Sequence, residues 1–206
     1  MFRSIQNYFS KKNLKDDKYS YLFDDPVEDE YICFDCETTG LSVQNDDIIS
    51  IGAVLIKGNT IVSSKKFVKF VKPKTKLQIE AIKVHHIREM DLEDAEDIDE
   101  VIEEFIDFIG NRKLVGYFLE FDIAMVNKYL KPKIGINLPN KAYEVSGIYH
   151  DYKIEKIPQS NIDLRFDVIM EDLQIPTMGK HDAFNDAIMT AMMFLKLKNQ
   201  PKVKIR

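Results

Sequence analysis

Cysteines and long apolar runs are scarce in this sequence of 206 residues, and each absence excludes a class of protein. Two cysteines cannot form a disulfide framework, and they fit a reducing compartment. Cys33 and Cys36 are spaced C-x-x-C, but in a strand they would face opposite sides of a sheet, so we interpret them as packing residues. No run of about 18 apolar residues is present to span a membrane, and the N-terminus lacks the pattern of a secretory signal. We therefore expect a cytoplasmic protein without membrane contact.

Basic residues are fewer than acidic residues, so the formal net charge is −5. As an average, this value argues against a broad surface for nucleic acid. The acids are clustered, however: residues 16–30 carry seven acids and one base, and residues 91–107 carry ten acids and no base. The rest of the chain has a balance of +11 and could face a polyanion, although a scatter of solvated lysines is an equally good interpretation. The lysines concerned are Lys128, Lys131, Lys133, Lys141, Lys153 and Lys156.

The first 29 residues differ from the rest of the chain. Apolar residues at helical spacing are followed by a polar run of mixed charge that ends at Pro26. We expect an appendage outside the core, which could be a docking segment, a helix packed on the domain or a partly disordered tail. The apolar residues at helical spacing are Phe2, Ile5 and Phe9.

Two carboxylates stand at the end of the first apolar run. The stretch from Tyr31 to Cys36 is aromatic and β-branched enough to be a strand, and Gly40 follows as a turn residue. Because strand side chains alternate between faces, Asp35 and Glu37 emerge side by side. Their repulsion and desolvation are hard to explain unless a cation lies between them, although a solvated strand end is the alternative. A hard divalent ion, Mg²⁺ or Mn²⁺, suits oxygen ligands of this kind.

A meander and two helices are predicted next. Residues 47–57 alternate into a second strand, and Gly58-Asn59 is typical of a tight hairpin into a third strand that ends near Val71. A short helical pattern runs into His85. Residues 98–109 place apolar side chains on one stripe and their acids toward water.

The following segment indicates parallel strands. Residues 113–117 are short and apolar like a buried strand, and a helical pattern covers about 120–130. Strand, helix and strand signals after a meander predict an α/β fold with a mixed central sheet flanked by helices. Asp122 falls in the first turn of that helix, where open sheets often place ligands, although a charge favoured by the helix dipole is the alternative.

The C-terminal third predicts a His and Asp pair. After a basic region with a strand near residues 142–146, Ser160 and Asp163 resemble a capping box for a helix that runs to Pro176. Asp182 can cap a last helix, which leaves His181 on the preceding loop and Asp186 one turn inside. A His on a loop end and an Asp on a first turn can converge on one site, although a lone His is often structural.

Three segments together resemble the exonuclease motifs of the DEDD superfamily, His-containing branch, to which the proofreading epsilon subunit of bacterial DNA polymerase III and its stand-alone relatives belong. Val84-His85-His86-Ile87 also resembles the family's Val-His-Gly-Ile segment, with His86 in place of glycine. One departure is Gly116-Tyr117-Phe118, where many relatives read Gly-His-Asn, so relatives' substrate preferences transfer poorly. The three motifs are Asp35-x-Glu37-Thr38-Thr39-Gly40, Phe121-Asp122 after a Leu-Val-Gly strand, and His181-x-Ala-x-x-Asp186-Ala-x-x-Thr190.

The resemblance implies a ribonuclease H-like exonuclease domain over residues 30–197, followed by a basic tail at 198–206. It implies 3′→5′ hydrolysis of nucleic acid, most consistent with single-stranded DNA 3′ ends in proofreading or repair, with a polymerase or another replication protein as a possible partner. Two Mg²⁺ ions, for which Mn²⁺ can substitute, would be held by four carboxylates, and His181 would accept the proton of the attacking water. The implied metal ligands are Asp35, Glu37, Asp122 and Asp186. The residues implied to border the terminal nucleotide are Thr38, Thr39, Gly40, His85 and Phe121.

Other functions stay open at this point. An RNA-directed exoribonuclease would share every motif, and an endonuclease of the same fold would share the acids but not the spacing from His181 to Asp186. A docking module without catalysis would lose ligands, whereas this chain keeps all of them. A regulatory phosphate-binding protein would need no histidine that activates water. Thr38 could equally just brace the turn.

Overall fold

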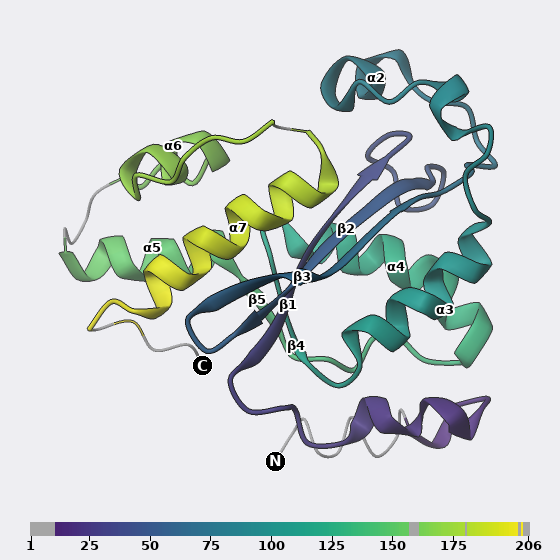
Figure 1. Ribbon diagram of the computed structural model, residues 1–206, viewed down its shortest axis with the longest axis horizontal. Helices are drawn as coiled ribbons and strands as arrows, with labels where there is room; N and C mark the ends of the chain where they lie inside the picture. Colours follow the sequence, from purple (N-terminus) through teal and green to yellow (C-terminus); the bar gives the residue numbers. More distant parts are fainter. Residues whose placement is uncertain (1–10, 157–160, 180, 202, 204–206) are drawn as a thin grey trace.

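A five-stranded sheet lies at the centre of the computed structural model, which describes residues 11–156, 161–179, 181–201 and 203. The strand order is β3-β2-β1-β4-β5, with β1, β2 and β3 antiparallel and β4 and β5 parallel to β1. The predicted antiparallel meander with parallel strands beside it is therefore confirmed (Figure 1). The strands are β1 (Glu30–Thr38), β2 (Ile48–Lys57), β3 (Thr60–Phe70), β4 (Lys113–Gly116) and β5 (Ala142–Glu144).

Helices cover both faces of this sheet (Figure 1). The helices α3 and α4 pack on one face, and α5, α6 and α7 pack on the other. Among the described residues, no helix has both the length and the apolar character needed to cross a bilayer. The helices are η1 (Asp17–Phe23), α2 (Ile79–His85), η2 (Glu89–Leu92), α3 (Ile98–Ile109), α4 (Leu119–Ile134), α5 (Val145–Lys156), α6 (Phe166–Asp172) and α7 (Ala183–Lys198).

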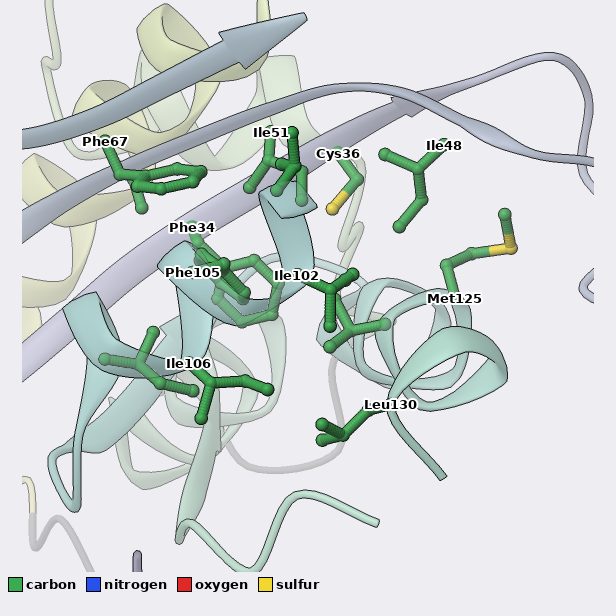
Figure 2. Close-up of a cluster of buried hydrophobic side chains, with 14 of the residues drawn as sticks. Phe34, Cys36, Ile48, Ile51, Phe67, Ile102, Phe105, Ile106, Met125 and Leu130 are labelled. Atoms are coloured by element: carbon green, nitrogen blue, oxygen red, sulfur yellow. The ribbon is translucent and has the colours of Figure 1, made fainter. Parts of the chain in front are cut away.

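The alternation of β1 divides its side chains between two cores. Phe34 and Cys36 face α3 and α4, and Figure 2 shows Phe34 and Phe67 gathered around Phe105 of α3. The ring centroids of Phe34 and Phe67 lie 5.2 and 5.4 Å from that of Phe105. Cys33 lies in the other core, beneath α7, so the two cysteines face opposite sides of the sheet as packing residues.

The N-terminal segment does not lie wholly outside the core, contrary to the sequence expectation. Tyr19 and Leu22 of η1 are each only 4% exposed and belong to the core of α3 and α4. The Tyr21 hydroxyl donates to Asp107 of α3 at 2.7 Å, and the Lys15 backbone N–H donates to the Ile134 carbonyl at 2.9 Å. Residues 11–25 therefore pack as part of the domain, whereas the helical pattern over residues 2–9 lies outside the described residues.

One helix was not predicted, and two helix boundaries differ from the prediction. The helix α5 was missed because Gly147 and several tyrosines obscure its periodicity, although Val145 and Tyr149 are buried at helical spacing. The helix α6 begins only at Phe166, since residues 161–165 are not helical; Ser160 of the proposed capping box lies outside the described residues. At the C-terminus, α7 continues through Lys198, the first residue of the expected tail.

The lysines of residues 128–156 do not form one free basic surface. Lys128, Lys133 and Lys153 each pair with an acid of the same domain, at N–O distances of 3.2, 2.7 and 2.9 Å. Acids of the same domain therefore neutralise these three lysines. This favours scattered lysines over one surface for a polyanion at these positions. The side chain of Lys156 lies outside the described residues.

Candidate active site

The strand β1 delivers two carboxylates to the face that α7 covers. Asp35 and Glu37 point to the same side as Cys33, and both are only partly exposed. Neither carboxylate accepts a hydrogen bond from any part of the chain that the structure describes. Buried anions without donors are costly, so this pair requires another source of compensation.

A glycine in β2 lets the first turn of α7 approach these acids. Gly52 pairs with Asp35 across the sheet, and a Cβ at Gly52 would stand 2.1 Å from the Phe184 backbone nitrogen. Asp182 caps α7 as predicted, since its side chain accepts from the Asn185 N–H at 2.9 Å. Only glycine therefore leaves room for α7 to reach the sheet at the level of Asp35.

The resulting cluster brings three carboxylates together from distant parts of the chain. One carboxylate oxygen each of Asp35, Glu37 and Asp186 lies within 4.8 Å of the others. The helix α7 contributes Asp186 from its first turn, as the spacing of the third motif predicts. This donor set consists of oxygen alone, which suits a hard divalent cation.

Asp122 lies beside this cluster but has a structural contact of its own. Its Oδ1 accepts a hydrogen bond from the Cys36 backbone N–H at 3.1 Å, which ties the first turn of α4 to β1. The N-terminus of α4 is held in turn by Glu144, whose Oε1 and Oε2 accept from the backbone N–H groups of Phe118 and Leu119 at 3.1 and 2.8 Å. Asp122 is only 4% exposed.

The acids disturb one another electrostatically. Burial raises the pKa of Asp35 well above its usual range, and the neighbouring charges of Asp122 and Glu37 raise it further. Burial also raises the pKa of Glu37 to about 7, with Asp186 adding to the effect. The pKa of Asp122 is raised mainly by burial. Such carboxylates either keep protons at neutral pH or hold a cation, so the residues present fit a divalent metal.

His181 shares a cavity with two of these acids, Asp35 and Asp186. The cavity has a volume of about 270 Å³. The His181 backbone N–H donates to Asp186 Oδ2 at 3.1 Å, and the residue adopts a left-handed conformation with φ of 59°. The expected convergence of His181 and Asp186 is therefore present. The residues that line the cavity are Asp35, Tyr117, Arg165, Phe166, Asp167, His181 and Asp186.

A second cavity of about 180 Å³ lies on the other side of His181, which lines both. His85 lines this second cavity and is only 6% exposed. Its Nδ1 accepts from the Ile87 backbone N–H at 3.0 Å, so its Nε2 carries the proton when the ring is neutral. Burial lowers the pKa of His85, and the neighbouring His86 and His181 lower it further.

Side-chain hydrogen bonds hold the turn after β1 together. They leave Thr39 unable to make the substrate contact that was expected of its side chain. Thr39 is fully buried, and its hydroxyl accepts from the Asp47 backbone N–H at 2.9 Å, so its side chain cannot border a nucleotide. The Thr38 hydroxyl donates to the Gly40 carbonyl at 2.7 Å, which is the bracing role that the sequence left open. A Cβ at Gly40 would stand 2.3 Å from the side-chain amide nitrogen of Gln78, which would have to shift.

Several residues at the site were not found from the sequence as site residues. The sequence could have indicated Gly52, because a glycine inside a strand often marks a place where another backbone comes close. Tyr117 was noted only as a departure from the family pattern, and the structure shows its hydroxyl donating to the Leu164 carbonyl at 2.9 Å. That bond fastens the segment before α6, so Arg165 and Phe166 reach the wall of the cavity. No local pattern indicates either of them.

Similarity to known proteins identifies the family of the chain. Residues 32–194 match a family model, RNase_T, described as exonuclease. The chain is 33% identical over 175 residues to the PolC-type DNA polymerase III of Caldanaerobacter subterraneus, covering 83% of this chain but only 12% of that protein. It is 29% identical over 188 residues to the DNA polymerase III subunit epsilon of Aquifex aeolicus, covering 91% of this chain and 87% of that protein.

A solved structure shows the same fold. The chain resembles E. coli Exonuclease I in complex with a dT13 oligonucleotide, with a TM-score of 0.71 and 15% sequence identity. The match covers 84% of this chain and 41% of that one. The ribonuclease H-like fold expected from the sequence is thus confirmed.

Proposed function

The chain belongs to the exonuclease family, and we propose that it is a metal-dependent 3′→5′ exonuclease that releases nucleoside 5′-monophosphates from single-stranded DNA. The observation that carries this proposal is the cluster of Asp35, Glu37 and Asp186, of which Asp35 and Asp186 line the same cavity as His181. A cluster that served only to bind phosphate would place cations there, whereas this one gathers anions.

The acids would hold the divalent ions of the family. Asp35, Glu37 and Asp186 are the nearest set, and Asp122 would complete it from the first turn of α4. When bound, two Mg²⁺ or Mn²⁺ ions would stabilise the charge that develops on the attacking and leaving oxygens. The same charge would relieve the repulsion that raises the pKa of Asp35 and Glu37.

His181 would act as the general base. His181 is exposed and lines the cavity, and its backbone N–H is bound to Asp186. An imidazole in this position can accept the proton of the attacking water and pass it to solvent. His85, the backbone at Gly40 and the ring of Phe121 are proposed to border the terminal nucleotide.

Single-stranded DNA is the proposed substrate because relatives of the chain are DNA polymerase III proteins and the solved structure contains an oligo-dT strand. Association with a polymerase or another replication protein is a further part of the proposal. The chain spans 12% of the length of the Caldanaerobacter subterraneus relative, and the Aquifex aeolicus relative, of which it covers 87%, is a subunit of DNA polymerase III. An RNA-directed exoribonuclease is the second candidate, because no residue described above distinguishes a 2′-hydroxyl.

The direct test is degradation of matched substrates. A single strand labelled at its 5′ end should shorten stepwise in Mg²⁺ or Mn²⁺, whereas a circular single strand should stay intact. RNA of the same sequence, tested in parallel, decides between the two candidate substrates. Cleavage of the circle would identify an endonuclease, and hydrolysis in the presence of excess chelator would overturn the role of metal.

Single substitutions test the cluster. Asp35→Asn and Asp186→Asn should each abolish hydrolysis, because each removes a ligand charge while keeping the shape of the side chain. Both variants should stay folded, since amides relieve the mutual repulsion of the acids. Asp151→Asn is the matched control, because this carboxylate of α5 is exposed and remote from the cavity. Full activity of Asp35→Asn would contradict the proposal.

A further inference from the structure

We propose that Phe118, stacked on Phe121, forms a platform for an unpaired base of the substrate strand just outside the catalytic cavity. This inference rests on the proposed function and deepens it by assigning a second contact to the strand. It concerns the position at which the chain departs from the Gly-His-Asn pattern of many relatives.

The two rings form an exposed aromatic surface. Phe118 is 66% exposed, and its neighbour Tyr117 lines the catalytic cavity. Its ring lies 6.1 Å from that of Phe121 at an interplanar angle of 19°, so the rings are stacked. Phe121 also packs against the core of α3 and α4, which makes it a firm support.

The backbone holds Phe118 in a costly conformation. Its φ is 56°, in the left-handed region that bulky residues rarely adopt. The Glu144 carboxylate binds the Phe118 and Leu119 N–H groups, which fixes the turn between β4 and α4. Strain of this kind persists where the surroundings impose it, and it clusters at functional sites. The exposed ring of Phe118 packs on Phe121 and not into the core of α3 and α4.

The platform stands next to the catalytic residues. Phe118 follows Tyr117, which lines the cavity of Asp35 and His181, and it precedes Asp122 on the first turn of α4. Phe118 itself does not line that cavity. The terminal nucleotide would occupy the cavity, so the base that stacks on Phe118 belongs to a nucleotide that precedes it in the strand.

The chemistry selects unpaired bases. Every base has a π-face, so stacking on an aromatic ring is tolerant of sequence and strong enough to lower a dissociation constant about 5- to 100-fold per base. A base held in a duplex is already stacked and paired, and would have to leave the helix to reach the ring. The platform therefore favours single-stranded 3′ ends, whether of DNA or RNA.

The test compares Phe118→Ala and Phe118→Trp with wild type on a short oligo-dT strand. Phe118→Ala should lower kcat/KM about 5- to 100-fold, mostly through KM, and Phe118→Trp should restore it because a larger ring also stacks. Met90→Ala is the matched control, since Met90 is 63% exposed on η2, away from the cavity. An unchanged kcat/KM for Phe118→Ala would overturn the proposal.

A modified oligonucleotide tests the contact between Phe118 and a base separately. In oligo-dT with abasic residues upstream of the terminal nucleotide, wild type should lose the same factor, and Phe118→Ala should lose almost nothing more. Full additivity of the two losses would contradict stacking. Hydrolysis of the unmodified strand by wild type tests the proposed function separately, because its absence would reject that function whatever Phe118 does. Fluorescence anisotropy of a labelled oligonucleotide, measured in chelator, compares the affinities of wild type and Phe118→Ala without hydrolysis.

Folding controls complete the design. Phe118→Asn and Phe118→Gly place residues that tolerate the left-handed conformation at this position. Their melting temperatures should equal or exceed that of wild type, while their affinity for the strand falls as in Phe118→Ala. A fall of several degrees would assign Phe118 a structural role and reject the platform.

Discussion

At the scale of single residues, His181 combines three features that a structural histidine rarely shows. It is exposed, it adopts a left-handed backbone, and it lines the cavity of Asp35 and Asp186. Its backbone N–H bond to Asp186 ties the loop before α7 to this acid. A side chain held in this way is available for chemistry, so its loss should affect turnover more than stability.

His181→Ala should lower kcat about 10²- to 10⁴-fold with little change in KM, because a positioned proton acceptor contributes about this much. Steady-state kinetics in saturating Mg²⁺ measures the split. His86→Ala is the matched control, since His86 is also exposed and left-handed, with φ of 60°. Near-normal turnover of His181→Ala would remove this residue from the mechanism.

At the scale of elements, Asp47 joins three segments next to the site. Its Oδ1 accepts from the Tyr129 hydroxyl of α4 at 2.6 Å, and its Oδ2 accepts from the Lys74 and Thr75 N–H groups at 2.9 and 2.7 Å. Its own N–H donates to the Thr39 hydroxyl. The start of β2, the loop after β3 and α4 are thus held to the turn after β1, which explains why Thr39 is buried.

Asp47→Asn should lower the free energy of unfolding at pH 7 by about 2–3 kcal/mol, the cost of losing hydrogen bonds to a charged acceptor. Burial alone would raise the pKa of Asp47, but hydrogen bonds from Tyr129 and Thr75 lower it to about 2. A carboxyl with a lowered pKa stabilises the fold above its unfolded value near 4, and this contribution disappears as the pH falls toward 2.

The difference between wild type and Asp47→Asn should therefore be constant above about pH 5 and shrink between pH 4 and 2. Urea unfolding across this range measures it. Asp151→Asn is the control, because the Asp151 side chain is 89% exposed on α5 and its loss should leave unfolding nearly unchanged. A difference that persists undiminished at pH 2 would show that the charge of Asp47 is not the cause.

At the scale of the whole molecule, the N-terminal segment completes the core. The structure buries Tyr19 and Leu22 against α3 and α4, and Gly135 lets this segment pass close by, since a Cβ there would stand 2.2 Å from the Asn13 carbonyl oxygen. A boundary at residue 29, as the sequence suggests, would therefore cut through one hydrophobic core.

Leu22→Ala should lower the free energy of unfolding by about 2–5 kcal/mol, the usual cost of a buried leucine, and lower the melting temperature accordingly. Thermal unfolding followed by circular dichroism measures the change. Val27→Ala is the control, because Val27 is 38% exposed in the same segment. If Leu22→Ala unfolds like wild type, residues 11–29 are a separable appendage after all.

The sequence by itself determined the local features of this protein. Alternation in β1 places Asp35 and Glu37 on one face and divides Cys33 from Cys36, because successive strand side chains point to opposite sides. The N-cap at Asp182 and the apolar stripe of α3 can also be predicted from the residues next to them in the chain. Such features depend on sterics and hydrogen bonds within a few residues, so they can be predicted from the order of residues.

Only the tertiary structure decided which of these features meet. Asp186 reaches Asp35 because Gly52 lets α7 approach the sheet, and Arg165 enters the cavity wall because Tyr117 binds the segment before α6. The burial of Thr39, which removes its side chain from the expected substrate contact, comes from Asp47. These contacts join residues far apart in the chain, and their geometry depends on how the helices pack on the sheet, for which no local pattern contains the information.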